Sequence, residues 1–372
     1  MHRRSFLAAA AAATIAAPAL ARRAVAQAAP VIRLVAGDLD EPWGIAFVPG
    51  GGALVTDRGG SLLRLGADGS RAAVSGAPPV EVAGQGGLLD VMVPRDFARS
   101  RAVFLTFSKR QGNGAGTALA AARLASDGRS LTDLRVIFEA APGGRGGRHF
   151  GSRVVELPDG TLAMTIGDRG NDALAQDLSR HEGTVVRLNR DGSVPADNPF
   201  VGRKDARPEI WSWGHRNPQG AALDARGRLW VSEHGPRGGD EVNLVRRGAN
   251  YGWPKVTHGT AYSGLPITNL RSAPGYEDPA HVWVPSIAPS GHAICSGRMF
   301  PDWRGHHLIG SLKFNLIARL DPTTPGPAGW AETRIETPET RRVRDVREAP
   351  DGAIWFIAEN AGAIFRMAAP GA

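Results

Sequence analysis

The sequence of 372 residues predicts an all-β fold, a six-bladed β-propeller, on two observations. The first is composition: 48 glycines and 27 prolines bound short apolar runs, and few segments show the period of a helix, which is typical of strands and turns. The second is recurrence. Six such runs start 46 to 79 residues apart, whereas one four-stranded blade needs roughly 40–50 residues, so the longer spacings leave room for loops. A pair of β-sandwiches is the alternative fold.

Each of the six runs is short and stops at a loop. Several follow a tight turn, as at the Pro-Asp-Gly sequences of 158–160 and 350–352. In chain order the runs are 53–56, 103–107, 162–166, 229–232, 308–311 and 354–357. Because no linker or low-complexity segment interrupts residues 27–372, we expect them to form a single domain built from these blades.

The first 26 residues are predicted to be a cleaved export signal of the twin-arginine type. Arg3 and Arg4 precede an apolar run over 7–20, and residues 24–26 read Ala-Val-Ala, as at a cleavage site. The run is about 14 residues long, whereas a span of the bilayer needs about 20. We therefore expect no membrane span after cleavage, and a periplasmic or secreted protein.

The charge and the cysteine content limit the possible partners. The formal net charge of +8 includes four arginines within the first 26 residues, so removal of these residues lowers it to about +4. There is no basic arm or stripe, which makes nucleic acid a poor partner and an anionic small ligand a better one. Cys295 is the only cysteine, so stability has to come from a core rather than from an intramolecular disulfide.

Polar residues directly follow several of the apolar runs. Asp168, Glu233 with His234, Lys313 and Glu359 each lie where a predicted strand stops. Collected at one end of several strands, these side chains could form a shared site around the propeller axis. Taken singly, each is also what an ordinary solvated loop begins with.

Two segments carry residues suited to catalysis or to ligand binding. His149 lies in a glycine-rich loop and, with a pKa near neutrality, suits a general base, although a lone loop histidine is more often structural. Arg216, Asn217 and Gln219 offer a guanidinium and two amides within four positions, which can hold a carbonyl or a carboxylate. The alternative is a turn whose amides cap its own backbone.

Two further segments suggest a cation site and an anion site. The acids and the Gly-Pro backbone of 233–243 suit Ca²⁺, which takes carboxylate and carbonyl oxygens, but do not match an EF-hand. Arg342 and Arg344 lie two apart, so in a strand they would share a face and, with Lys313, could bind an anion. Arginines on a solvated strand are the common alternative.

In combination and in order, six stretches of the chain resemble the soluble PQQ-dependent glucose/sorbosone dehydrogenase family, most closely its aldose sugar dehydrogenase branch. The similarity extends from about Leu39 to Arg366. The stretches are Gly-Gln-Gly-Gly-Leu-Leu (84–89), His-Phe-Gly (149–151), Arg-Asn-Pro-Gln-Gly (216–220), Glu-His-Gly-Pro (233–236), Asn-Tyr-Gly-Trp-Pro (250–254) and Arg-Val-Arg-Asp-Val (342–346).

The resemblance implies oxidation of aldose sugars at C1 to lactones, with hydride transfer to pyrroloquinoline quinone (PQQ) and with Ca²⁺ as the second cofactor. His149 would be the general base, and Arg216 would stabilise the negative charge that develops on the quinone. The remaining positions that match are cofactor contacts at Asn217, Gln219, Lys313, Arg342 and Arg344, a sugar contact at Gln85, Ca²⁺ ligation by the carbonyls of Gly235 and Pro236, and a second Ca²⁺ near Glu241 and Tyr251. Besides the sugar, an electron acceptor, small molecule or protein, is the expected partner.

One position departs from the family pattern. The glucose-oxidising branch carries an acid just before the base, whereas this chain has Arg148, which argues against tight recognition of glucose. Two other functions are compatible with a propeller: a Ca²⁺-dependent lactonase or hydrolase, which would not need the cations Lys313, Arg342 and Arg344, and a non-catalytic carbohydrate-binding propeller, which would not need a base and an arginine together.

Overall fold

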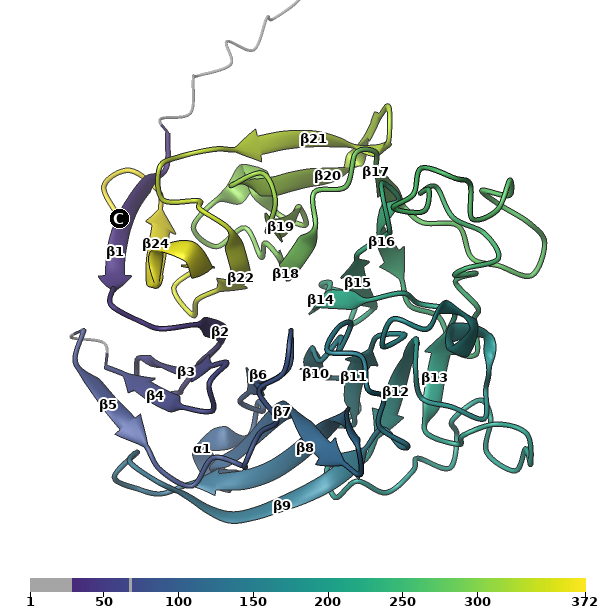
Figure 1. Cartoon of the computed structure of the whole chain (residues 1–372). Helices are drawn as coiled ribbons and strands as arrows, with labels where there is room; N and C mark the ends of the chain where they lie inside the picture. Colours follow the sequence, from purple (N-terminus) through teal and green to yellow (C-terminus); the bar gives the residue numbers. More distant parts are fainter. Residues whose placement is uncertain (1–28, 67–68) are drawn as a thin grey trace, which may run out of the picture.

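The computed structural model describes residues 29–66 and 69–372, which form six four-stranded antiparallel sheets arranged as blades around a central axis (Figure 1). The predicted six-bladed propeller is therefore confirmed, and the pair of β-sandwiches is excluded. The predicted export signal lies outside the described residues.

The strands of each blade follow one another along the chain from the axis outward, except in the sixth blade. They are β2 (Pro42–Phe47), β3 (Ala53–Asp57), β4 (Leu62–Leu65) and β5 (Arg71–Val74); β6 (Leu88–Met92), β7 (Ala102–Gln111), β8 (Gly114–Leu124) and β9 (Leu131–Glu139); β10 (Val154–Glu156), β11 (Leu162–Ile166), β12 (Thr184–Leu188) and β13 (Ile210–Trp213); β14 (Pro218–Leu223), β15 (Leu229–Glu233), β16 (Asp240–Leu244) and β17 (His281–Trp283); β18 (Pro289–Ile294), β19 (His307–Ser311), β20 (Ile317–Gly326) and β21 (Gly329–Ile335); and β22 (Val343–Glu348), β23 (Ile354–Ala358) and β24 (Ala363–Ala368) with β1 (Val31–Ala36).

All six apolar runs found in the sequence are the second strands of their blades, namely β3, β7, β11, β15, β19 and β23. A second strand lies between two strands of its own sheet and packs against neighbouring blades on both faces. Every residue of β3, β11, β15 and β19 is accordingly buried. A strand buried on both faces reads as a continuous apolar run, which explains why these strands are the ones that the sequence reveals.

The hydrophobic core is divided among the six interfaces between adjacent blades. Leu54 of the first blade, for example, packs in one cluster with Leu105 and Phe107 of the second. Clusters of the same kind join the other neighbouring pairs, including the sixth blade and the first, where Ile364 packs with Val55. The ring is thus held together around its whole circumference.

The sixth blade is completed by the N-terminal strand. β1 pairs with β24 in antiparallel register from Val31 opposite Ala368 to Ala36 opposite Ile364. Strands from both ends of the chain therefore close the ring (Figure 1).

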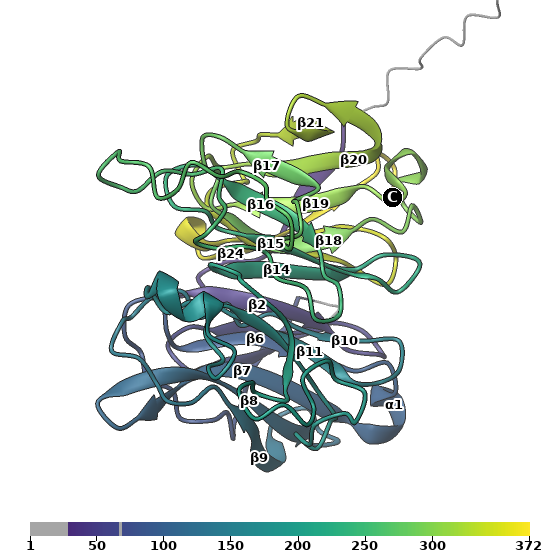
Figure 2. The same cartoon turned by 90° about the vertical axis from the view of Figure 1, so that its right-hand side faces the viewer.

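Helical structure is limited to short segments in the described part of the chain. These are α1 (Phe97–Ser100) and the 3₁₀ turns Asp172–Gln176, Pro301–Trp303 and Glu359–Ala361. None of the helices in residues 29–66 and 69–372 has the length and apolar character to cross a membrane. The longest excursion from the ring is the connection between β16 and β17, which projects outward beside those strands in the side view (Figure 2).

Candidate active site

The predicted catalytic and cofactor residues gather at one edge of the blades. His149, Arg216 and Arg342 come shortly before the innermost strands β10, β14 and β22. Acidic residues that follow the second strands lie beside them, as Asp168 lies beside His149 and Glu359 beside Arg342. The start of one antiparallel strand lies next to the end of the following strand, so each hairpin brings a basic and an acidic residue together at the same edge.

His149 is fixed through both its backbone and its ring. Its backbone has a φ of 55°, in the left-handed region that few residues other than glycine adopt. The backbone N–H donates to Oε1 of Gln85 at 2.7 Å, and ring Nδ1 lies 2.6 Å from Oδ1 of Asp168. The structure therefore brings the predicted base and the predicted sugar-contacting Gln85 into direct contact.

Asp168 determines which ring nitrogen of His149 is free. Oδ1 also accepts from the backbone N–H of Gly170 at 2.7 Å, and Oδ2 accepts from Nε1 of Trp253 at 2.9 Å. A carboxylate held in this way can only accept, so Nδ1 of His149 carries the proton that the two groups share. Nε2 of His149 is left as the nitrogen that can take a proton from a substrate.

The pKa of the His149 imidazole lies below its ordinary value of 6.5. Burial is the largest cause, because it disfavours the charged ring. The hydrogen bond and charge of Asp168 oppose this shift, while the charges of Arg216 and Arg148 reinforce it. The ring is consequently neutral at neutral pH and able to act as a base.

Arg216 is held by the acid at the end of β15. Its backbone N–H donates to Oε2 of Glu233 at 2.7 Å, and its Nη1 donates to the carbonyl of Gly235 at 2.7 Å and more weakly to that of His234 at 3.3 Å. The guanidinium also lies 5.3 Å from the ring of Trp253, the same residue that bonds Asp168. The supports of Arg216 and of His149 therefore share one tryptophan.

The two amides of this segment have different environments. Asn217 is fully buried, and its Oδ1 accepts from the backbone N–H of Gly151 at 3.2 Å, which ties the fourth blade to the third. Its Nδ2 has no hydrogen-bond partner among the described residues. Gln219, in β14, accepts at Oε1 from Nη1 of Arg344 at 2.8 Å, so its side chain joins the cation group.

Arg342 and Arg344 converge because they share one carboxylate. Nε of Arg344 lies 2.8 Å from Oε2 of Glu359, and Nε of Arg342 lies 3.3 Å from Oε1 of the same residue. Regular strand alternation does not bring them together, since Arg342 has a left-handed φ of 48° and the register shifts between Val343 and Asp345. The predicted convergence is present, but its cause is Glu359.

A cavity of about 220 Å³ lies beside these groups. Its walls include the side chains of Gln85 and Gln219, the indole of Trp43 and the ring of Phe150. Three arginines and two glutamates supply its charges, which are Arg58, Arg342, Arg344, Glu41 and Glu359. Two aromatic residues with an excess of cations suit a ligand that is both aromatic and anionic.

Lys313 is exposed in the loop after β19, and its Nζ lies 4.8 Å from the centre of the Phe314 ring. It is not among the residues that line the cavity. The structure thus joins Arg342, Arg344, Gln219 and Gln85 around one space, with Lys313 further out.

The predicted Ca²⁺ ligands lie in the loop after β15. The carbonyl of Gly235 accepts from Arg216, and that of Pro236 lies 3.4 Å from Oγ of Ser286. In residues 29–66 and 69–372 no group of three or more His, Cys, Asp or Glu side chains could hold a metal. A Ca²⁺ here would rely on backbone oxygens, which suit this hard cation, and on oxygens from a bound ligand.

The residue predicted for a second Ca²⁺ site, Glu241 on β16, lies opposite Glu233 across the β15–β16 pair. Nδ2 of Asn243 donates to both carboxylates, at 3.0 and 3.1 Å. Burial raises the pKa of Glu241, and the charge of Glu233 raises it further. The hydroxyl of Tyr251 is used by the backbone of Leu244 and Arg246. The side chain that contacts Glu233 in its place is His215, whose Nδ1 lies 2.8 Å from Oε1.

Several residues of the site were not given a role from the sequence. The sequence identifies Asp168 and Glu359 only as polar groups at strand ends, and Glu233 as such a group and as one of the acids of the Ca²⁺-suited segment, without the partners of any of the three. Trp253 lies within one of the stretches that resemble the family, and Trp43 lies near the start of the similar region, but no local pattern indicates that Trp43 lines the cavity or that Trp253 supports the base. The signal for the acids was present, because each lies across a hairpin from a predicted site residue.

Comparisons with known proteins place these observations in a family. The model of the glucose/sorbosone dehydrogenase family matches residues 39–366. The aldose sugar dehydrogenase YliI of Escherichia coli is 40% identical to this chain over 99% of both chains. A crystal structure of the soluble aldose sugar dehydrogenase from Escherichia coli, in the apo form, superposes with a TM-score of 0.87 at 39% identity. The superposition covers 91% of this chain and 99% of that one.

The names of two more distant relatives mention a quinone cofactor. The quinoprotein glucose dehydrogenase B of Acinetobacter calcoaceticus is 27% identical over 87% of this chain and 84% of its own. The PQQ-bound aldose sugar dehydrogenase of Streptomyces coelicolor superposes with a TM-score of 0.76, at 27% identity, over 92% of this chain and 99% of that one.

Proposed function

The chain belongs to the glucose/sorbosone dehydrogenase family and is thus an oxidoreductase acting on sugars, and we propose that it oxidises aldoses at C1 to lactones with PQQ and Ca²⁺. One observation carries this proposal. A neutral imidazole, His149, is fixed by Asp168 at the same blade edge as a cavity lined by Arg342 and Arg344. A base next to an anion-binding cavity is what a sugar dehydrogenase with a carboxylated quinone requires.

The chemistry of the base follows from its hydrogen bonds. Nε2 of His149 accepts the proton of the anomeric hydroxyl as the C1 hydride leaves, and Nδ1–H remains bonded to Asp168, which stabilises the imidazolium that forms. The loss of one hydride and one proton converts the cyclic aldose into its lactone. Gln85 positions the sugar, because it lines the cavity while its Oε1 holds the backbone N–H of His149.

When bound, PQQ supplies the quinone that takes up the hydride, and Ca²⁺ polarises that quinone. Arg342, Arg344 and Lys313 would bind the carboxylates, and Gln219 and Asn217 would contact the ring system. Arg216 would stabilise the charge that develops on the quinone oxygen. The carbonyls of Gly235 and Pro236 would hold Ca²⁺, and Glu241 the second ion.

The two alternative functions receive less support from the geometry. An axial lactonase needs free carboxylates at the centre of the ring, whereas Asp90 and Asp345 there are engaged by arginines. A propeller that only binds carbohydrate does not require a base such as the His149–Asp168 pair beside a cationic cavity. Neither rival accounts for both features.

Reconstitution tests the proposal. Protein freed of cofactors by dialysis against a chelator should reduce a redox dye with glucose, xylose or maltose only after PQQ and Ca²⁺ have both been added. Addition of NAD in place of PQQ is the control and should give no activity. Full activity without PQQ, or with NAD alone, would contradict the cofactor assignment.

We also propose that the protein is exported and passes its electrons to a small-molecule or protein acceptor outside the cytoplasm. The basis is the leader, residues 1–26. Mass spectrometry of the exported form should find Gln27 near its N-terminus, and replacement of Arg3 and Arg4 by lysine should block export. An intact leader on active cytoplasmic protein would contradict this.

A further inference from the structure

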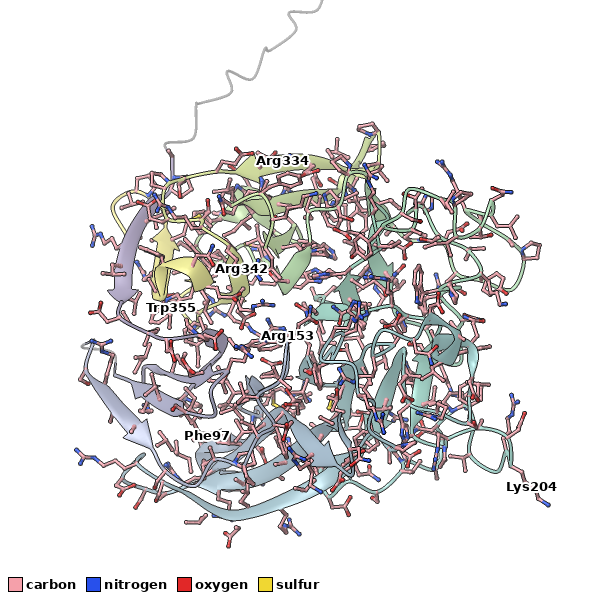
Figure 3. All side chains as sticks on the ribbon, viewed as in Figure 1. Phe97, Arg153, Lys204, Arg334, Arg342 and Trp355 are labelled. Carbon is pink, nitrogen blue, oxygen red and sulfur yellow. The ribbon has the colours of Figure 1, made fainter. Side chains whose placement is uncertain are left out.

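Arg153 has the largest fully buried side chain among the described residues, with 1% of its surface exposed. It directly precedes β10, and Figure 3 shows it close to the centre of the ring. A guanidinium in such a place has to find partners for all of its charge and its donors. The carboxylates and carbonyls that provide these partners come from three other blades.

Two of the partners are carboxylates without any exposed surface. Nη1 of Arg153 lies 2.9 Å from Oδ1 of Asp90 in β6, and Nη2 lies 3.1 Å from Oδ1 of Asp345 in β22. Arg347 contacts the same two acids, at 2.8 and 3.0 Å. The four side chains form a neutral cluster, defined here as the axial cluster.

The remaining donors of Arg153 reach two residues of the candidate site. Nε donates to the backbone carbonyl of Gln219 at 2.7 Å, and Nη2 donates to the backbone carbonyl of Arg344 at 3.1 Å. These two residues come from the fourth and the sixth blade and lie 125 positions apart, yet their side chains are joined by a hydrogen bond of 2.8 Å and both line the cavity. One guanidinium therefore holds the backbones of both.

Trp43 extends this link to a wall of the cavity. The guanidinium of Arg153 lies 4.3 Å from the centre of its ring, and that of Arg344 lies 5.8 Å away. Trp43 also lines the cavity. A single buried side chain therefore contacts the indole of Trp43 and the backbones of Gln219 and Arg344, the two residues whose side chains meet at the cavity.

We propose that Arg153 is a positioning residue that sets the relative placement of Gln219 and Arg344 and thereby the affinity of the cavity for its anionic cofactor. This inference rests on the proposed PQQ-dependent function. Arg153 does not reach the cofactor, since it does not line the cavity; it acts through the two backbones that it holds. A lysine at this position keeps the charge for the axial cluster but cannot reach both carbonyls with a planar fork of donors.

Arg347 provides a matched control. It bonds the same two aspartates as Arg153, so its replacement disturbs the axial cluster in the same way. No hydrogen bond joins it to Gln219 or Arg344 within the described chain. A role of Arg153 in stability alone would be shared by Arg347, whereas a role in positioning would not.

The experiment compares Arg153→Lys with Arg347→Lys. PQQ is titrated into each apoprotein at fixed Ca²⁺ and followed by quenching of tryptophan fluorescence, and the Tm of each apoprotein is measured alongside. We expect Arg153→Lys to raise the Kd for PQQ by about 10–100-fold, the usual effect of removing a support of a binding residue, and Arg347→Lys to leave it within about threefold despite a similar fall in Tm.

Equal PQQ affinity of Arg153→Lys and wild type, or equal losses in both variants, would overturn the inference. If Arg153→Lys does not fold, the charge-balanced double variants Arg153→Gln with Asp90→Asn and Arg347→Gln with Asp90→Asn replace the pair, with the same expected difference. Failure of the wild type itself to bind PQQ is a separate result, which would remove the proposed function and the inference with it.

Discussion

Asp168 and Glu359 occupy corresponding places in the third and the sixth blade, just beyond the end of the second strand, yet their effects are opposite. Asp168 holds one neutral ring, His149, and both of its oxygens are occupied by donors. Glu359 holds two permanent cations, Arg342 and Arg344. The place in the blade brings each acid to the site, and its partner decides whether that side of the site moves a proton or binds an anion.

The strongest test of this division removes the group that moves the proton. His149→Ala should lower kcat by about 10²–10⁴-fold, the usual contribution of a positioned base, while PQQ binding stays close to that of the wild type. Steady-state kinetics at saturating sugar and a PQQ titration measure the two effects separately. A variant that retains near-normal kcat would show that His149 is not the base.

Removal of Arg342 and Arg344 should weaken anion binding rather than proton transfer. Arg342→Ala combined with Arg344→Ala should raise the Kd for PQQ by about 10²-fold or more, because charge-assisted hydrogen bonds to carboxylates are lost. At saturating PQQ the kcat should fall far less than in the His149 variant. If the double variant binds PQQ normally, the anion is bound elsewhere, and Lys313 becomes the next residue to replace.

The pH dependence of kcat/KM tests the His149–Asp168 pair separately from the arginines. The pKa of His149 is lowered from 6.5 by burial, so the acid limb of kcat/KM should have its midpoint below pH 6.5, with activity lost as the ring becomes protonated. Asp168 raises that pKa through its hydrogen bond and its charge. In Asp168→Asn the limb should therefore move to still lower pH, while the maximal rate falls by about 10–100-fold because the ring loses its orientation.

In Glu359→Gln the same acid limb should stay in place, because Glu359 is not among the groups that shift the pKa of His149. A shift of the limb to higher pH in Asp168→Asn, or an equal shift in both variants, would show that the two acids are not divided between base and anion.

The smallest effect is expected at Arg148, where the chain departs from the glucose-oxidising branch. Its side chain is exposed and can only donate hydrogen bonds, so it offers no acceptor for sugar hydroxyls. We expect broad oxidation of aldoses, with kcat/KM values for glucose, galactose, xylose, arabinose and maltose within about 10³-fold of one another. A larger preference for one monosaccharide would amount to about 4 kcal/mol of selective transition-state binding and would contradict this.

The fold was predictable where both faces of a strand are covered. The fully buried strands β3, β11, β15 and β19 each contain a short apolar run, and the recurrence of six such runs predicts the number of blades. The outer strands β5 and β21 are largely exposed or half-buried, with mixed sequences that carry no such signal. Their existence follows only from the four strands that a blade requires.

The site was predictable in part, and a simple rule would have extended it. His149 and Asp168 flank the hairpin β10–β11, just as Arg342 and Glu359 flank β22–β23, so sequence reasoning could have paired them. The contact between Gln219 and Arg344 is different, because it joins the innermost strands of the fourth and sixth blades, which are 125 positions apart in sequence. Such a contact depends on how the ring closes, which no local pattern specifies.

The pairing of β1 with β24 has a consequence for how the protein is made. Ala368 follows its partner Val31 by more than 300 residues, so the sixth blade cannot be completed until all of the residues between them have been synthesised. Contacts across so long a separation make folding slow, because the entropy of closing the loop is lost before the contact forms. Until β1 has paired, the outer edge of β24 is left open, and an unpaired strand edge of this kind favours association with other chains.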